Sequence, residues 1–235
     1  MQTNNSWPMT VLDVTGDDAA SFLQGQLTCD VNRLEATAHS LGAWCNPKGR
    51  VIVLFRIRKL DDGFELLLPQ DLAESTVKRL TMFRFRAKVD FATRDAVAAD
   101  FGDEVQSFET WQAQNLRNGV ASIAAAQSEK FTPHMLNLDL LDAISLDKGC
   151  YTGQEVVART HYKGATRRRL MRFESGSDAA PGDKIQLDGR DVGEVVNVNS
   201  GELLAVVPVD SATAGLELNA TSLKHLPLPY LDRDA

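Results

Sequence analysis

At residues 148–155 the chain reads Lys148-Gly149-Cys150-Tyr151-Thr152-Gly153-Gln154-Glu155, a thiol between two glycines just before an expected helix. Thr152 and Glu155 have the S/T-x-x-E spacing of a capping box, which predicts that a helix begins at Thr152. The positive end of that helix and the Lys148 ammonium would both favour the thiolate form of Cys150. Gly149 and Gly153 are predicted to allow close backbone approach.

An ordinary explanation for Cys150 is that it is a small buried residue in a turn, as most free cysteines are. The surroundings favour a reactive role instead. A cysteine that only fills space in the core does not require Lys148 beside it, and apart from Tyr151 the turn lacks an apolar partner. Glu155 likewise has two readings, as the capping carboxylate or as a ligand-binding one.

Further sequence blocks lie on both sides of the octapeptide. In chain order they are Phe22-Leu23-Gln24-Gly25-Gln26-Leu27-Thr28 with Asp30-Val31, Cys45-Asn46-Pro47-Lys48-Gly49-Arg50, Phe131-Thr132-Pro133 with Leu136-Asn137-Leu138-Asp139, and Ala158-Arg159-Thr160-His161-Tyr162. With the octapeptide they resemble the YgfZ-type folate-binding proteins, relatives of the glycine-cleavage T-protein. The resemblance covers nearly the whole chain.

The resemblance implies tetrahydrofolate binding and a role in iron–sulfur cluster assembly or repair, with iron–sulfur enzymes, including tRNA-modifying ones, as partners. It implies that Cys150 is the functional thiol, tuned by Lys148. The expected folate-binding residues are Gln26, Asp30, Tyr151, Gln154, Glu155 and Arg159. No metal ligand is predicted, because the four histidines and three cysteines lack metal-ligand spacing.

The pattern of short elements predicts an α+β fold. Strands are expected over 9–14, 41–44, 50–58, 64–68, 88–91 and 96–99, and helices from about Ala19 and over 71–81, 104–115 and 135–144, whereas 124–129 reads as a loop or a poorly packed helix. Four further strands, at 170–173, 184–187, 192–198 and 203–207, predict a small antiparallel barrel. We expect a folate-binding α+β region over 1–165 and the barrel over 166–235, joined through 163–166. The resemblance implies the same T-protein-like architecture.

Charge is uneven in a chain whose net charge is −7. Residues 156–172 contain no acid but carry Arg159, His161, Lys163, Arg167, Arg168, Arg169 and Arg172. This stretch is either a solvated basic strand or an anion site that suits the glutamate tail of a folate. A tRNA or an acidic protein partner would satisfy the same cations. Glu155, Asp139 and Asp142 are candidate acceptors for the pterin edge, and Tyr151 or Trp44 could stack on its ring.

Two alternatives to the accessory role stay open. One is a folate-binding scaffold in which Cys150 is structural; the other is an aminomethyl-type transferase. The T-protein carries a catalytic acid in a G-G-x-x-D-D turn, whereas this chain reads Gly49-Arg50-Val51-Ile52-Val53-Leu54. Because no acid stands there, we expect an accessory protein with a transferase-like fold and not a stand-alone enzyme.

Composition is typical of a cytoplasmic protein. Three cysteines without C-x-x-C spacing argue against a disulfide framework. The first eight residues have no basic or apolar region of a signal peptide, and no apolar run approaches the roughly 20 residues of a membrane span. The acidic net charge disfavours direct nucleic-acid binding.

Overall fold

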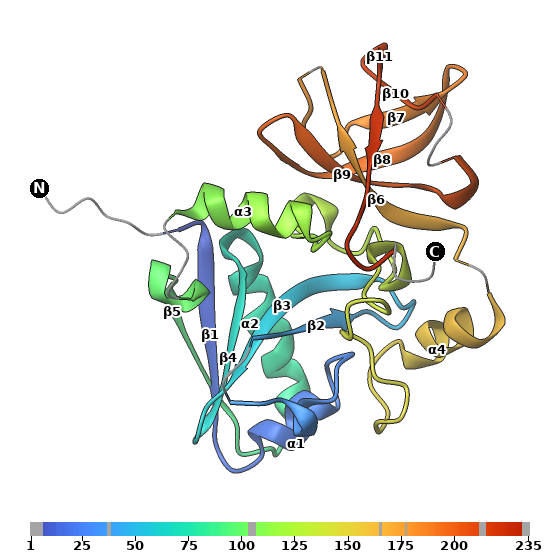
Figure 1. Ribbon diagram of the computed structural model, residues 1–235. Coiled ribbons are helices and arrows are strands. Elements are labelled where there is room, and N and C mark those ends of the chain that lie inside the picture. Colours follow the sequence, from blue (N-terminus) through green and yellow to red (C-terminus); the bar gives the residue numbers. More distant parts are fainter. Residues whose placement is uncertain are drawn as a thin grey trace, which may run out of the picture.

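Two antiparallel sheets that share one hydrophobic core form the framework of the protein (Figure 1). The computed structural model describes residues 7–36, 39–102, 107–164, 166–176, 178–211 and 215–231. The mixture of antiparallel sheets and separate helices confirms the predicted α+β class.

The first sheet has five strands in the order β2-β3-β4-β1-β5. They are β1 (Met9–Thr15), β2 (Ser40–Cys45), β3 (Val51–Lys59), β4 (Gly63–Pro69) and β5 (Asp90–Asp95). Alternate residues of β1 enter different cores, because successive side chains of a strand point to opposite faces. Leu12 and Val14 pack on one face, whereas Met9 and Val11 pack on the other.

Helices cover both faces of this sheet (Figure 1). The helices α1 (Ala19–Gln24) and α2 (Gln70–Arg84) bury their apolar side chains in the core that contains Leu12. The short helix η2 (Ala98–Phe101) and α3 (Phe108–Arg117) pack on the other face through Phe101 and Trp111. The predicted helix over 71–81 is confirmed, since α2 buries Leu72, Thr76 and Leu80 at helical spacing.

The second sheet has seven strands in the order β11-β10-β7-β8-β9-β6-β12 and curls into a nearly closed barrel. Its strands are β6 (Arg168–Glu174), β7 (Lys184–Leu187), β8 (Arg190–Asn199), β9 (Glu202–Pro208), β10 (Glu217–Leu218), β11 (Thr221–Ser222) and β12 (Lys224–Leu226), with η5 (Val209–Ser211) after β9. Leu203, Ala205 and Val207 fill the barrel interior. The predicted C-terminal barrel is therefore confirmed.

The outer face of the barrel sheet packs on the rest of the chain. Leu204 and Val206 alternate with the interior residues of β9 and join a core that also contains Cys45 and Leu54 of the first sheet. The chain from Leu116 to Ala143 contributes further apolar residues to the same core. The region just before the octapeptide is thus held between the two sheets.

The predicted helix over 135–144 is wrong. Only a single turn, η4 (His134–Leu136), forms there, and the chain then continues through turns. Asn137 and Asp142 adopt left-handed conformations with φ of 57° and 53°, which a helix does not accommodate. The buried Asn137 side chain instead donates hydrogen bonds to the Leu170 carbonyl and the Tyr230 hydroxyl, so tertiary contacts override local propensity.

Smaller differences concern element ends. The two strands expected over 88–91 and 96–99 are replaced by the single strand β5 followed by η2. The expected loop over 124–129 contains a short 3₁₀ turn, η3 (Ala125–Gln127). Helix α3 begins at Phe108, and the predicted start at Glu104 lies outside the described residues, as does Ala165 in the predicted linker. Within the described ranges, no helix is both long and apolar enough to cross a membrane.

Candidate functional site

The octapeptide ends in α4 (Gln154–Lys163), which begins two residues later than the capping-box spacing predicts. Gly153 stands at the N-cap with φ 83° and ψ 0°, and no side chain caps the helix. Thr152 therefore lies in a turn before the helix, where the Gln154 amide donates to the Tyr151 carbonyl. Glu155 is exposed on the first turn of α4. The predicted capping box is wrong, because the turn requires the left-handed conformation that glycine provides.

Gly153 also allows the start of α4 to approach the loop between β2 and β3. A Cβ atom on Gly153 would lie 2.4 Å from the Asn46 carbonyl oxygen, and one on Gly49 would lie 2.9 Å from Cβ of Val156. Gly49 has a positive φ of 67°. The close approach predicted for Gly153 is confirmed, whereas that predicted for Gly149 is wrong, because a Cβ there would meet no atom within 4 Å.

The octapeptide exposes Cys150 while burying residues on both sides of it. Lys148 is 9% exposed and Tyr151 is 6% exposed, yet Cys150 is exposed to solvent. The other two cysteines, Cys29 and Cys45, are buried. Free cysteine is among the most buried residue types, so its presentation on the surface between two anchored neighbours is unusual.

Lys148 extends inward toward the segment after α1. Its Nζ donates hydrogen bonds to the carbonyl oxygens of Leu27 and Cys29, both at 2.7 Å, and lies 5.2 Å from the centre of the Tyr151 ring. Burial lowers the pKa of Lys148 to about 8. The structure thus directs this cation to two carbonyls of the N-terminal region, and its predicted tuning of Cys150 stays a prediction.

Tyr151 and Gln154 hold the turn that follows Cys150. The Gln154 Oε1 accepts a hydrogen bond from the Tyr151 amide at 3.3 Å. The Tyr151 hydroxyl is buried without a hydrogen-bond partner in the described part of the chain, as are Trp44 Nε1 and Gln26 Oε1. Burial raises the pKa of the Tyr151 phenol. Trp44 and Tyr151 therefore serve as core aromatic residues that each leave one polar atom unsatisfied.

Thr28 joins three segments at the base of the site. Its hydroxyl donates to the Ala143 carbonyl at 2.7 Å and accepts from the Ala43 amide at 2.9 Å. Its own carbonyl accepts from the Ser145 amide. Thr28 is completely buried, so these bonds fix the chain after α1 against β2 and against the approach to the octapeptide.

Asp30 is positioned by its own neighbours. Its Oδ1 accepts hydrogen bonds from Gln24 Nε2 at 2.9 Å and from the Asn32 amide at 3.1 Å, which starts the short helix η1 (Val31–Arg33). Its Oδ2 lies 3.3 Å from Nε of Arg33. The Gln24 side chain in turn accepts from the Val31 amide. Asp30 is thus fixed in orientation before any ligand binds.

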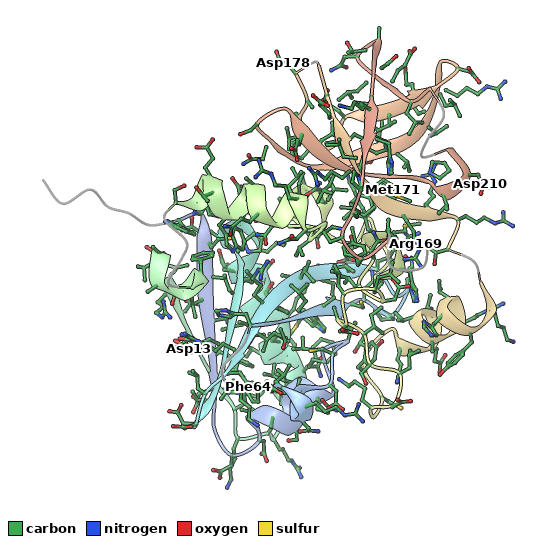
Figure 2. The ribbon with its side chains drawn as sticks, in the orientation of Figure 1. Asp13, Phe64, Arg169, Met171, Asp178 and Asp210 are labelled. Atoms are coloured by element: carbon green, nitrogen blue, oxygen red, sulfur yellow. The ribbon has the colours of Figure 1, made fainter. Side chains whose placement is uncertain are left out.

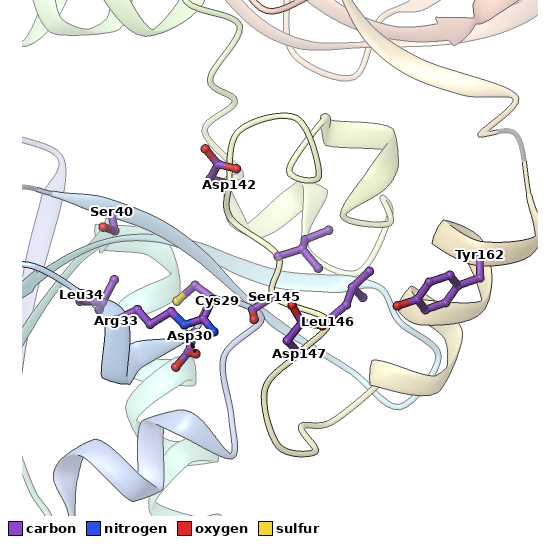
Figure 3. A pocket seen from close by; sticks show the side chains of 11 residues that line it. Cys29, Asp30, Arg33, Leu34, Ser40, Asp142, Ser145, Leu146, Asp147 and Tyr162 are labelled. Atoms are coloured by element: carbon purple, nitrogen blue, oxygen red, sulfur yellow. Dashed lines mark ion pairs between the residues drawn. The ribbon is translucent and has the colours of Figure 1, made fainter.

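A cavity of about 560 Å³ lies between this segment and the approach to the octapeptide (Figure 3). Asp30 and Arg33 line one side, Asp142 and Asp147 come from the chain before Lys148, and Tyr162 approaches from α4. Cys29 and Ser145 are among the other lining residues. The cavity combines three carboxylates, one guanidinium and one aromatic ring.

Half of the lysines and arginines in the basic stretch bond to other parts of the structure. Arg169 lies where the barrel sheet meets the rest of the chain (Figure 2). It pairs with Asp139 through two guanidinium nitrogens at 3.0 and 2.8 Å, and both side chains are largely buried. Arg172 pairs with Glu202 and Arg168 donates to the Val192 carbonyl. The carboxylate of Asp139, a candidate acceptor for the pterin edge, therefore already has a partner. The remaining cations, Arg159, Lys163 and Arg167, are exposed without an ion-pair partner among the described residues.

The predicted site residues fall into two groups. Lys148 bonds to the N-terminal segment that carries Gln26 and Asp30, and Tyr151 and Gln154 form the turn after Cys150. Of the predicted folate-binding residues, Asp30 is the one that lines the cavity. By contrast, Glu155 and Arg159 lie on the exposed surface of α4. Sequence reasoning did not single out the cavity residues Arg33, Asp147 and Tyr162. Asp147 directly precedes Lys148, and Arg33 follows Asp30 by one turn. Their closeness in sequence to the motifs was therefore the signal that could have identified them as site residues.

Selective alkylation tests the exposure of Cys150. In the native protein iodoacetamide should modify Cys150 alone, because burial raises the pKa of Cys29 to about 11 and that of Cys45 to about 12 and also blocks access. Intact-mass measurement should show one adduct, and denaturant should reveal the other two. Modification of Cys29 at the same rate as Cys150 in native buffer would contradict this arrangement.

Comparison with known proteins places the chain among related sequences. No family model matches it. An uncharacterized protein of Haemophilus influenzae is 31% identical over 94% of this chain and 95% of that protein. Proteins named tRNA-modifying protein YgfZ are 26% identical in Klebsiella pneumoniae, over 100% of this chain and 94% of the relative, and 28% identical in Vibrio atlanticus, over 94% and 90%.

A solved structure shows the same fold. The glycine cleavage system aminomethyltransferase T of Bartonella henselae superposes with a TM-score of 0.73 over 94% of this chain and 84% of that protein, at 15% sequence identity. At this identity the likeness concerns the fold alone. The sequence relatives named YgfZ and the ordered motif blocks agree with each other, and the chain belongs to the family of YgfZ-type proteins.

Proposed function

We propose that this protein is a tetrahydrofolate-binding accessory protein that supports tRNA-modifying iron–sulfur enzymes in the cytoplasm, with Cys150 as its functional thiol. Relatives that align over most of the chain are named tRNA-modifying proteins. The resemblance of the octapeptide and its neighbouring blocks to the folate-binding family supports the cofactor and the iron–sulfur role. Its partners would be the iron–sulfur enzymes or the proteins that assemble their clusters.

The observation that carries the proposal is the presentation of Cys150. Two buried residues, Lys148 and Tyr151, anchor the chain on either side of the thiol, and the glycine contact at Gly153 fixes the helix that follows. A thiol held in this way is available to a partner or a reactive ligand without unfolding of its surroundings. A purely structural cysteine would be expected inside the core, where Cys29 and Cys45 lie.

The polar side chains that line the cavity beside the octapeptide fit the hydrogen-bonding groups of a reduced folate. Its volume of about 560 Å³ lies in the range of small-molecule sites. Asp30, Asp142 and Asp147 offer acceptors for the amino and ring N–H groups of a pterin, and Arg33 offers a partner for a glutamate carboxylate. Tyr162 supplies an aromatic face. When bound, tetrahydrofolate would supply a carrier for one-carbon groups.

The transferase alternative is disfavoured by the start of β3. Val51, Ile52, Val53 and Leu54 are all at most 7% exposed and pack in the hydrophobic cores. No carboxylate therefore stands where the T-protein carries its catalytic acid, and a proton acceptor for a substrate amine is missing at that position. Mutation of Cys150 distinguishes the proposed function from the scaffold alternative, in which Cys150 has no chemical role.

Complementation with Cys150→Ser tests the proposed function. In cells that depend on this protein, we expect the serine variant to lower the tRNA modification made by an iron–sulfur enzyme to the level seen without the protein. Oxygen in place of sulfur preserves the size of the side chain but removes its nucleophilicity and its soft-metal affinity. Asp210→Asn, a change at an exposed position on η5 outside the cavity, serves as a folded control. Full modification with the serine variant would favour the scaffold role.

A further inference from the structure

The C-terminal end of α2 exposes a group of large apolar side chains. Met82 is 63% exposed, Phe83 is 41% exposed and Phe85, which directly follows the helix, is 88% exposed. We refer to these three residues as the α2 tip. Single exposed apolar residues are ordinary on protein surfaces, but three within four positions concentrate apolar surface at one end of the helix.

The backbone of the α2 tip is strained. Phe85 is the C-cap residue and has φ 46° and ψ −108°, a positive φ that bulky residues rarely adopt and that glycine usually supplies at helix ends. The strained backbone directs an aromatic ring into solvent, where it gains no packing. Phe83 is held in place by an edge contact with Trp44, with ring centres 5.9 Å apart. The tip is therefore a fixed feature on a rigid helix.

The α2 tip lies within a basic stretch of the sequence. Residues 75–89 contain five cations and no acid in a chain of net charge −7. Arg79 pairs with Glu129 and Lys88 pairs with Asp17. Lys78 and Arg86 are exposed and have no ion-pair partner in the part of the chain that the structure describes. Lys78 precedes Met82 by one helical turn, so an unpaired charge and an apolar anchor share one face.

A shallow cavity of about 420 Å³ adjoins the tip. Its lining includes Phe85, three cations and two carboxylates, namely Arg84, Arg86, Lys88, Asp17 and Asp90. Arg84 is 3.8 Å from Asp90, a long and partly exposed ion pair that a stronger acidic partner could replace. The cavity thus places an aromatic wall next to guanidinium groups.

We propose that the α2 tip is a docking surface for an acidic protein segment that carries apolar anchor residues. Phe, Met and Arg are the side chains enriched in the cores of protein interfaces, whereas Lys and Glu are depleted there. Carboxylates of the segment would pair with Arg86 and Lys78, and its apolar side chains would cover Met82 and Phe85. A single-stranded RNA would stack on the phenylalanines, but Met82 offers it no flat face. The docking surface is independent of folate binding and of Cys150.

Fluorescence anisotropy with the full-length protein tests this surface. The probe is a fluorescein-labelled peptide in which Glu alternates with Leu and Phe, and the comparison probes are the same peptide with Lys in place of Glu and a labelled oligouridylate. We expect the acidic peptide to bind, and Phe85→Ser and Met82→Ser each to weaken that binding at least about tenfold. Val209→Ser, which removes a 40% exposed apolar side chain from η5, is the matched control.

Each other outcome overturns the proposal. Equal binding of the acidic peptide to the wild type and to Phe85→Ser, or no binding at all, would show that the tip does not dock such a segment. Binding of oligouridylate that Phe85→Ser abolishes would assign the surface to nucleic acid. Concentration-dependent self-association lost in Phe85→Ser would assign it to a contact between copies of this chain. Phe85→Ser should fold normally, because it removes an exposed ring.

Discussion

Replacing Gly153 with alanine is expected to lower the free energy of unfolding by about 3 kcal/mol, because two costs combine at this position. The added Cβ would lie 2.4 Å from the Asn46 carbonyl oxygen, so the start of α4 must move away from the loop between β2 and β3. Alanine must also adopt a φ of 83°, a left-handed conformation that disfavours L-residues by about 1–2 kcal/mol. Chemical denaturation measures the change.

Gly149→Ala provides a matched control in the same octapeptide. A Cβ at Gly149 meets no atom within 4 Å, and Gly149 is not among the glycines with a positive φ. We expect it to change the unfolding free energy by less than about 0.5 kcal/mol. Equal effects of the two substitutions would mean that the contact between Gly153 and Asn46 does not fix α4.

Lys148→Met is expected to lower the free energy of unfolding by about 2–4 kcal/mol. The substitution keeps the apolar stem but leaves the Leu27 and Cys29 carbonyls without the ammonium that bonds to both at 2.7 Å. Each buried acceptor left without a partner costs about 1–3 kcal/mol, and the saved desolvation of the cation offsets part of this. Lys163→Met, at an exposed position on α4, should have no more than a small effect.

The effect of Lys148→Met should also depend on pH. Burial lowers the pKa of Lys148 in the folded protein to about 8 from the usual 10.5. Between these values the unfolded chain binds more protons, so the contribution of Lys148 to stability rises with pH. The difference in unfolding free energy between wild type and variant should therefore grow from pH 8 toward pH 10.5. A difference that shrinks over this range would contradict the assigned burial of the ammonium.

Strands were the elements that the sequence specified best. In Met9–Thr15 and in Glu202–Pro208, successive apolar residues enter different cores on the two faces of the strand. This local pattern of apolar residues is enough to predict that each segment is a strand. The helix prediction for Met135 to Ile144 was wrong for the opposite reason, because contacts distant in sequence decide the structure there. The apolar residues of this segment have helical spacing, but Asn137 bonds to Leu170 and Tyr230, which are distant in sequence.

The candidate site likewise combines features that the local sequence predicts with features that depend on residues distant in sequence. The octapeptide predicts a close backbone approach at Gly153, but it does not predict the exposure of Cys150 or the segment that approaches Gly153. The target of Lys148 does not follow from the local sequence either, because it reaches carbonyls more than a hundred residues earlier in the chain. Capping chemistry at Thr152 was overridden by the Asn46 carbonyl, whose approach no local pattern reports.

Calorimetric titration of the purified protein with tetrahydrofolate tests the proposed cofactor site most directly. We expect saturable binding with a dissociation constant on the order of micromolar. Asp147→Asn, which removes a carboxylate from the cavity, should weaken it at least about tenfold, whereas Asp210→Asn at an exposed position outside the cavity should not. No saturable binding, or equal affinity of Asp147→Asn and wild type, would contradict the assignment of this cavity to folate.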